Sequence, residues 1–286
     1  MKPTQSQVAG LNGFLTSLHG IKLPVLAGEA KVFADYLNTL SGFKIIDEAL
    51  SSADKHVGRV IVDGVLQVGK DYEKQVRPAV QSIRGFPEAA TVSGFISLLN
   101  TKPLKSLINF KTPGTKSDLL MVARFFVGKG IETFDDLYAW LGPEQNRDSL
   151  LTKNSGLSGK VFRIADKTAD YFRVLVRHWD AVAVDRGIRE LLDKAKIISR
   201  YSKKYGYKEM RSIVQLAAVS HLNCRPVDLD AGIYDYYVSN KSGGNKPPRT
   251  TNVALSASGS SKYCIHCGVR IPHIARYCPK CGAYQP

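Results

Sequence analysis

Long apolar runs are missing from the sequence. No stretch of about 18 residues or more is both uncharged and apolar, although a membrane-spanning helix needs roughly that length. Residues 1–23 interleave Gln, Ser, Thr, Asn and Gly with their few apolar residues, unlike the continuous apolar segment of a secretory signal. We therefore expect a cytoplasmic protein without a membrane partner, associated with the nucleoid if its source is a bacterium.

Acidic residues are scarce as well. The 286 residues include 40 Lys and Arg against 25 Asp and Glu, so the formal net charge is +15. This excess favours a polyanionic partner such as nucleic acid, although charge alone does not separate nucleic acid from an acidic membrane surface. With 44% hydrophobic and 23% charged residues, the chain has the composition of a folded protein, and its length allows about two domains.

Cysteine is rare outside the C-terminal end: of five cysteines, four lie within the last 23 residues. They form two Cys-x-x-Cys pairs, each followed by glycine, with ten residues between the pairs: Cys264, Cys267, Cys278 and Cys281. In a reducing compartment this spacing indicates metal ligation before disulfides, because two tight turns bring four thiolates around one tetrahedral ion. Residues 263–286 therefore resemble a short zinc ribbon with one structural zinc ion, and iron in the same geometry is the alternative.

Acids are absent from residue 239 onward. Residues 239–262 consist mainly of Ser, Gly, Asn, Thr and Pro with scattered Lys and Arg, which is typical of a flexible basic linker. The tail that begins at residue 239 carries seven basic residues and therefore +7, which leaves +8 for residues 1–238. We expect the ribbon to bind DNA through basic side chains such as Arg270 and Arg276, with a protein partner as the alternative.

Apolar residues recur three or four positions apart through most of residues 1–238, which is the helical period. Helices are expected over residues 29–40, 72–83, 116–126, 134–141, 161–176, 186–192, 208–221 and 228–238. Only the run RVIVDGVLQV at residues 59–68 looks like a strand, and a buried helix fits it nearly as well. We predict an all-α body over residues 1–238, without an internal repeat.

Lys167 and Asp185 are the candidate reactive residues. Lys167 falls at the edge of the apolar face of the helix expected over 161–176, from which a lysine side chain can reach a cleft. Residues 181–184 form a short extended segment that places Asp185 directly before the next helix, where a carboxylate caps the backbone N–H groups and can project into a groove. Taken alone, these features are also explained by a solvated lysine and a helix-capping aspartate.

A family resemblance suggests a function for this pair. The run DKTADY beginning at Asp166, together with AVAVD ending at Asp185, resembles the signature of the helix-hairpin-helix DNA glycosylase superfamily, the endonuclease III-like group. In that family the lysine and the aspartate lie 18 residues apart, as Lys167 and Asp185 do, and face each other across the base pocket. The segment CRPVDLDAGIYDYY, which begins at Cys224, resembles the closing helix of the family. The resemblance covers residues 58–237 and implies a two-lobed helical body.

Three features depart from the family pattern. Arg163-Ile164-Ala165 stands where the family hairpin has two glycines, so the amides that hold a phosphate are set differently and Arg163 supplies positive charge to the DNA instead. Arg186 and Gly187 follow Asp185 where many members carry a histidine. The ten-residue gap in the cysteine quartet does not match the iron–sulfur loop of the family, so no cluster is expected.

The resemblance implies an enzyme that cleaves the N-glycosidic bond of a damaged or modified DNA base. Cleavage places positive charge on the sugar, which the carboxylate of Asp185 would stabilise while it activates the attacking group. That group is either water or the amine of Lys167, and attack by the amine gives a Schiff base and then strand cleavage, the AP-lyase reaction. The base is unspecified, and a defence role against modified phage DNA is as open as DNA repair.

The target base has to be flipped out of the duplex before it can react. The resemblance assigns Gln67 to the gap that the base leaves. The segment KAKIISRYSKKYGYK, which contains Lys203 and Lys204, interleaves six basic residues with three tyrosines and indicates either a phosphate-binding surface or a solvated helix end. We expect a monomer bound to double-stranded DNA, and the alternatives are a non-catalytic DNA-binding adaptor and an RNA-processing or ribosome-associated factor.

Overall fold

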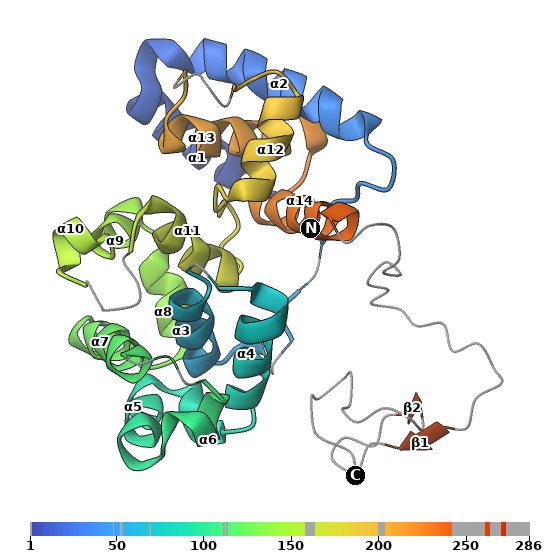
Figure 1. The fold of residues 1–286 in the computed structure, drawn as a ribbon. Helices are drawn as coiled ribbons and strands as arrows, with labels where there is room; N and C mark the ends of the chain where they lie inside the picture. The colour runs from blue at the N-terminus through green and yellow to red at the C-terminus, as the bar shows by residue number, and fades with distance from the viewer. Residues whose placement is uncertain are drawn as a thin grey trace. The chain divides into compact units, whose positions relative to one another are not determined.

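The computed structural model describes residues 2–47, 49–51, 54–68, 70–110, 112, 114–157, 164–199, 204–241, 261–263 and 270–272 of the chain. Within these ranges the secondary structure is almost entirely helical, as the apolar period predicts (Figure 1). The all-α class is therefore confirmed for the body. No helix in this part of the chain combines the length and the hydrophobicity that are needed to span a bilayer.

The chain divides into two compact units, and it enters each of them more than once. Unit 1 consists of Met1–Ala49, Tyr138–Ser158 and Arg163–Lys246, and unit 2 of Leu50–Leu137, Gly159–Phe162 and Pro247–Pro286. Both candidate reactive residues belong to unit 1. The geometry of that pair is therefore set within a single unit.

The helices of unit 1 come from both ends of the body. Their bounds are α1 Gln5–His19, α2 Leu23–Thr39, α9 Glu144–Ser149, α10 Thr152–Ser155, α11 Asp166–Leu175, α12 Arg186–Lys194, α13 Tyr207–Leu216 and α14 Pro226–Lys241. A 3-10 turn, η1 Gly20–Lys22, joins α1 to α2, and a π-helical segment, η5 Ala217–Leu222, continues α13. α2 packs against α13 and η5, so residues near the two ends of the body share one core.

The core of unit 1 forms where the apolar faces of α2, α12 and α13 meet. Its fully buried members include Leu26, Phe33, Leu192, Ile213 and Val214. Complete burial of one such side chain stabilises a fold by about 1.5–3 kcal/mol. The extended segment at residues 181–184 is also buried throughout, so the chain leaves the core directly at Asp185.

Unit 2 is a second helical bundle. Its elements are α3 Val57–Leu66, η3 Tyr72–Val76, α4 Arg77–Ile83, η4 Pro87–Ala90, α5 Val92–Thr101, α6 Leu104–Ile108 and α7 Thr115–Gly128, and α8 Phe134–Leu141 crosses the boundary between the units. α5 packs against α7 and η4, and α3 packs against α4 and α7.

The run RVIVDGVLQV, the one stretch that looked like a strand, is helical instead. α3 covers most of it, and all 10 residues of this helix are buried. A helix that is enclosed on all sides has no solvent-exposed face, so its sequence is hard to distinguish from a buried strand. His56 caps the helix, because its Nδ1 accepts a hydrogen bond from the Arg59 N–H at 3.3 Å.

α11 begins later than the expected start at residue 161, because Ile164 and Ala165 lie outside the helix. The Ile164 N–H donates to Thr152 Oγ1 at 2.8 Å, and the Ile164 carbonyl oxygen accepts from the Thr152 N–H at 2.9 Å. These two bonds hold Ile164 outside the helical ladder. The helix therefore starts at Asp166, whose carboxylate lies in the first turn, where the helix dipole favours negative charge.

Two short strands represent the C-terminal region. β1 Ser261–Tyr263 and β2 Arg270–Pro272 pair antiparallel with Lys262 opposite Ile271. They flank the first Cys-x-x-Cys pair in the sequence, but all four cysteines lie outside the described residues. The zinc ribbon and its ion therefore stay predictions.

We expect Gly58→Ala to lower the free energy of unfolding by about 1–3 kcal/mol, which is typical of overpacking. A Cβ atom at Gly58 would lie 2.8 Å from the Ala89 carbonyl oxygen and 2.9 Å from Ala89 Cβ. Gly128→Ala at the end of α7 is the matched control, because its Cβ meets no neighbouring atom of the described residues within 4 Å. Urea unfolding of both variants tests this, and equal stability of the two would contradict the close approach of α3 to η4.

Candidate active site

Lys167 lies in the first turn of α11, on the edge of its buried face. Its side chain is half-buried, and Nζ lies 5.4 Å from the centroid of the Tyr171 ring one turn later. An ammonium over a tyrosine ring is stabilised by the ring quadrupole, by roughly 0.5–1 kcal/mol at an exposed site. Tyr171 is therefore a neighbour of the lysine within the same helix.

Asp185 is the N-cap of α12, as the simplest interpretation predicted. Its backbone is extended, and its Oδ1 accepts a hydrogen bond from the Ile188 N–H at 3.0 Å. Burial raises the pKa of this carboxyl above its ordinary value, while the Ile188 bond and the positive charge of Lys167 act in the opposite direction. This carboxyl is therefore a helix cap that is partly shielded from solvent.

The two predicted residues both lie in unit 1. Lys167 belongs to α11 and Asp185 to the start of α12, and the charge of the lysine acts on the carboxyl of the aspartate. The opposite charges favour the ionised form of Asp185 against the cost of its burial. That the two side chains face each other across a base pocket stays a prediction.

A second carboxyl, which the sequence did not single out, adjoins this pair. Asp230 of α14 accepts a hydrogen bond from the Ala183 N–H at 2.9 Å, two residues before Asp185. Burial and then the negative charge of Asp185 raise the pKa of Asp230 to about 8. Little in the sequence singled out Asp230. It is one of several aspartates in the segment that begins at Cys224, and Asp228, two residues earlier, looked equivalent.

Asp228 has a different role, because it is neutralised by arginines. Arg177 Nη2 lies 2.6 Å from Asp228 Oδ1, and Arg225 Nε lies 2.7 Å from Asp228 Oδ2. Asp228 is fully buried, so these pairs compensate its charge. The two aspartates of the closing segment are therefore distinguished by their partners and not by their spacing.

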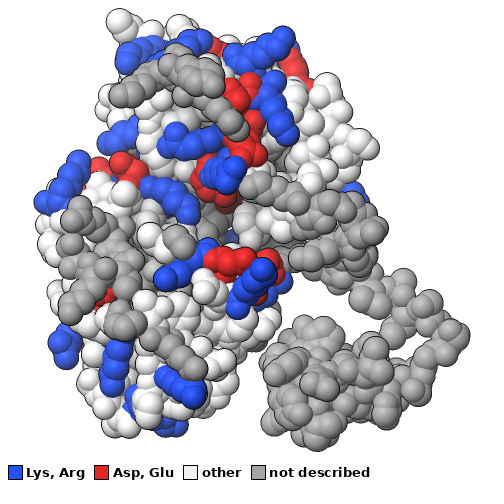
Figure 2. Space-filling model, viewed as in Figure 1, with Lys and Arg blue, Asp and Glu red and all other residues white. Residues whose placement is uncertain are grey.

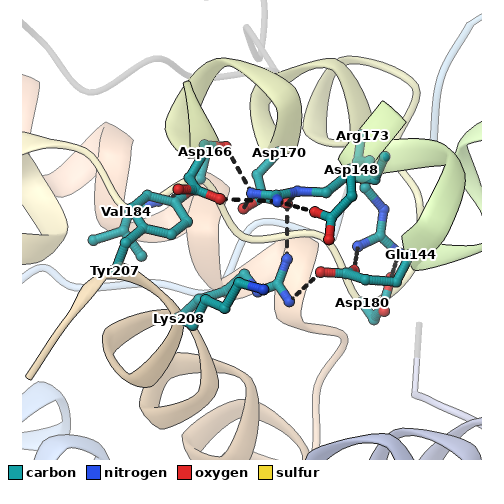
Figure 3. A network of polar contacts seen from close by, with 12 residues as sticks. Glu144, Asp148, Asp166, Asp170, Arg173, Asp180, Val184, Tyr207 and Lys208 are labelled. Carbon is teal, nitrogen blue, oxygen red and sulfur yellow. Dashed lines mark hydrogen bonds and ion pairs between the residues drawn. The ribbon is translucent and has the colours of Figure 1, made fainter. Parts of the chain in front are cut away.

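A buried network of charged side chains supports both helices of the site (Figure 3). Its centre is Asp170 of α11, which is fully buried. Arg147 binds this carboxylate through two bonds, Nε to Oδ1 at 3.0 Å and Nη2 to Oδ2 at 2.9 Å, and Arg211 Nη1 binds Oδ1 at 3.0 Å. Burial alone would raise the pKa of Asp170, but Arg211 and Arg147 together hold it below its ordinary value. Removal of one partner from such a buried pair typically costs about 3–5 kcal/mol.

Arg147 also fixes the turn of α11 that carries Lys167. Its Nη1 lies 2.9 Å from Asp166 Oδ1, and its Nη2 donates to the Asp166 carbonyl oxygen at 3.0 Å. Asp166 and Asp170 precede and follow Lys167 on the helix, so one arginine holds both sides of this turn. Because Arg147 is completely buried, the turn is anchored to the interior of unit 1.

Tyr207 connects the same network to the segment that ends at Asp185. Its hydroxyl forms a side-chain hydrogen bond with Asp170 and accepts one from the Val184 N–H at 3.2 Å. Burial and then the charge of Asp170 raise the pKa of Tyr207 well above its ordinary value, so the hydroxyl keeps its proton as a donor. Figure 3 shows Tyr207 beside Val184 and Asp170. Lys167 and Asp185 are therefore positioned by one common group.

The described part of the basic and tyrosine-rich segment is engaged within unit 1. Lys204 Nζ lies 2.7 Å from Glu29 Oε1, and the Tyr205 hydroxyl donates to the same oxygen at 3.0 Å. Lys204 is thus an ion-paired surface residue. This contact is closer to an ordinary surface segment than to a row of cations that are free to bind phosphates.

The other predicted residues either lie outside unit 1 or are described only in part or not at all. Gln67 is the C-cap of α3 in unit 2, where its backbone N–H donates to the Asp63 carbonyl oxygen at 3.1 Å. For Arg270 only the backbone in β2 is described. The remaining predicted positions, Arg163, Lys203, Arg276 and the four cysteines, lie outside the described residues. Within the described ranges no group of three or more metal-ligating side chains comes together.

An open cleft of about 450 Å³ is present in unit 2. It lies between the segment that contains Lys74 and Pro78 and the end of α6 at Asn109 and Phe110. None of the predicted site residues lines it. This cleft therefore adds nothing to the evidence for the Lys167 and Asp185 pair.

No family model, no curated protein and no solved structure matches the chain. The candidate site accordingly depends on the geometry of its residues and on the resemblance of two short motifs.

We expect Tyr207→Phe to lower the free energy of unfolding by about 1–3 kcal/mol, because the Val184 N–H and the Asp170 carboxylate both lose a buried partner. Tyr205→Phe is the matched control, since it removes a less buried hydroxyl bound to Glu29 and should change stability by under about 0.5 kcal/mol. Urea unfolding of both variants makes the comparison. Equal effects would mean that Tyr207 does not link the network to the extended segment.

Proposed function

We propose that the chain is a DNA glycosylase that cleaves the N-glycosidic bond of a damaged or modified base flipped from double-stranded DNA. The observation that carries the proposal is that the half-buried Lys167 of one helix acts electrostatically on the half-buried capping carboxylate of Asp185 at the start of the next. The base stays unassigned, so a modified base of phage DNA is as compatible with the site as a lesion of the host genome.

Asp185 is the residue proposed to act on the sugar. As the bond between C1′ and the base nitrogen breaks, positive charge develops on the sugar ring, and a fixed carboxylate beside it lowers the energy of that state. In the hydrolytic reaction the oxygen of water bonds to C1′, and the base leaves with the bonding electron pair and takes up a proton. The partial burial of Asp185 strengthens its electrostatic effect, because less water screens the charge.

Lys167 is placed for one of two tasks. Its neutral amine would attack C1′ and form a Schiff base, after which β-elimination cuts the strand. As an ammonium it would instead hold Asp185 ionised and bind a DNA phosphate. The two tasks predict different covalent chemistry, which makes them separable by experiment.

The charge of the chain supports a DNA partner. Residues 1–238 carry +8 and the basic tail carries +7. Figure 2 shows Lys and Arg side chains distributed over the face in view, interspersed with Asp and Glu. Such a surface attracts DNA in a salt-dependent manner, and the ribbon, with a structural zinc ion held by the four cysteines, would add a second contact with DNA or a protein.

Asp185→Asn is expected to lower the rate of base release by about 10²–10³-fold, the loss typical of a transition-state charge. Asparagine is as good an N-cap as aspartate, so α12 stays capped while the negative charge is removed. The measurement incubates the protein with genomic DNAs of differing base modification and counts abasic sites. Equal release by the variant would exclude Asp185 as the key group.

A covalent DNA adduct trapped by borohydride is expected if the Lys167 amine attacks the sugar, and Lys167→Ala should abolish it. Lys194→Ala is the control, because Lys194 is an exposed lysine at the end of α12. An adduct that persists in Lys167→Ala would assign the attack to another amine. Base release without any adduct would make the enzyme purely hydrolytic.

The second candidate is a non-catalytic DNA-binding adaptor. It is favoured by the capping bond of Asp185, which by itself gives the residue a structural purpose. An adaptor would bind DNA without releasing a base from any substrate, and Asp185→Asn would leave that binding unchanged.

A further inference from the structure

We propose that the open cleft in unit 2 binds one nucleotide, with the base against its apolar lining and the phosphate beside the lysines of its rim. The residues that line the cleft belong to unit 2, whereas Lys167 and Asp185 belong to unit 1. The proposed site therefore goes beyond the glycosylase function and does not depend on it. A free nucleotide and a nucleotide within a single strand share the chemistry that this cleft would recognise.

The cleft has the volume of a small-molecule site, and its two walls are joined. Its volume of about 450 Å³ falls within the roughly 300–1,000 Å³ that is typical of ligand sites. Ser82 of α4 donates through Oγ to the Leu107 carbonyl oxygen of α6 at 2.7 Å, which ties one wall to the other. The described lining residues are Lys74, Gln75 and Pro78 from η3 and α4, and Ile108, Asn109, Phe110 and Thr112 from the end of α6 and the residues after it.

The apolar part of the lining suits the faces of a base. Ile108 and Phe110 are buried, so their own packing fixes them, and Pro78 is an exposed apolar residue of the other wall. A planar base placed between these walls would remove apolar surface from water on both of its faces. The lining therefore favours a flat, uncharged ring system over a flexible chain.

Amide side chains of the lining suit the edge of a base. Asn109 is exposed and follows α6 with a left-handed backbone, φ 49°. Gln75 Oε1 accepts the Asp71 N–H at 3.3 Å, and in the described part of the chain the Gln75 NH₂ group and the Asn109 amide have no further partner. An amide offers a donor and an acceptor side by side, which matches the N6 and N7 edge of adenine. We therefore expect an adenine base.

Two lysines at the cleft form the rim that can bind a phosphate. Lys74 has a side chain that is 84% exposed, and its Nζ lies 3.9 Å from Asp71 Oδ2. An exposed ion pair of this kind contributes little, so the ammonium group can exchange the carboxylate for a phosphate. Lys70 Nζ lies 6.0 Å from the centroid of the Phe110 ring, so a second cation adjoins the lining.

The charges of the two walls favour an anion. Residues 89–117, which contain α5 and α6, include four lysines and no acid. On the other wall, Glu73 is paired with Arg77 and Asp71 with Lys74, so its acids are balanced. The excess of lysines gives this region a positive potential. Inorganic phosphate would use the lysines alone, whereas a nucleotide would also use the amides and the apolar lining.

Calorimetric titration of the full-length protein with adenosine monophosphate tests the inference. We expect saturable binding at one site per chain. Adenosine, which lacks the phosphate, and inorganic phosphate, which lacks the base, should each bind more weakly. The absence of saturable binding by the nucleotide would overturn the inference, and so would inorganic phosphate that binds as tightly as the nucleotide.

Two variants assign the binding to the cleft. Asn109→Gly removes the amide and keeps the left-handed backbone, which glycine adopts freely, and it should weaken binding about 3–10-fold, as expected for one lost hydrogen bond. Asn223→Gly in unit 1 is the matched control, because Asn223 is also exposed and also has φ 49°, and it should bind as the parent does. Lys74→Met should weaken binding of the nucleotide but not of adenosine. Equal affinities of the two glycine variants would overturn the inference.

A short oligodeoxyadenylate distinguishes the two sources of the nucleotide. Tighter binding of the strand than of the monophosphate, again weakened by Asn109→Gly, would assign the cleft to single-stranded nucleic acid. Tighter binding of the monophosphate would assign it to a free nucleotide, and either result supports the inference. Asp185→Asn should bind the monophosphate as the parent does, so the site can be demonstrated even if no base is released from any DNA.

Discussion

The carboxylate of Asp170 is the group on which the interior of unit 1 depends. It is fully buried and carries its charge only because two buried arginines, Arg147 and Arg211, bind it directly. A buried carboxylate without these partners would take up a proton, because burial disfavours its charged form. The site follows from the same group, because Arg147 holds the turn of Lys167 and Tyr207 holds the segment that ends at Asp185.

Two aspartates near the candidate site, Asp185 and Asp230, have different surroundings. Asp185 and Asp230 are chemically identical side chains, yet one lies at a helix N-terminus beside a lysine and the other accepts a backbone bond from the interior. Helix termini and opposite charges lower the pKa of a carboxyl, and burial raises it.

The two interpretations of Asp185 are compatible. A capping bond fixes the carboxylate through the Ile188 N–H, and a fixed carboxylate is what electrostatic stabilisation of a sugar cation requires. The capping role of Asp185 is therefore compatible with its proposed chemical role. The same geometry explains the glycine at position 187, because the Cβ atom of a larger residue would make close contacts with Tyr237 and Asp185.

The sequence by itself determined the helical class, the place of Lys167 at the edge of the apolar face of a helix and the cap at Asp185, because these depend on residues only a few positions apart. It left α3 open between a strand and a buried helix, because this helix has no solvent-exposed face. It placed the start of α11 too early, because Ile164 is bound by Thr152, which lies 12 residues before it. Only the tertiary structure decided that Asp170 meets Arg147 and Arg211, that Tyr207 reaches Val184, and that Asp230 binds the Ala183 N–H. Those partners lie 23 to 47 residues apart in the sequence. Whether a charged side chain is paired or protonated depends on which distant segments the packed core brings beside it.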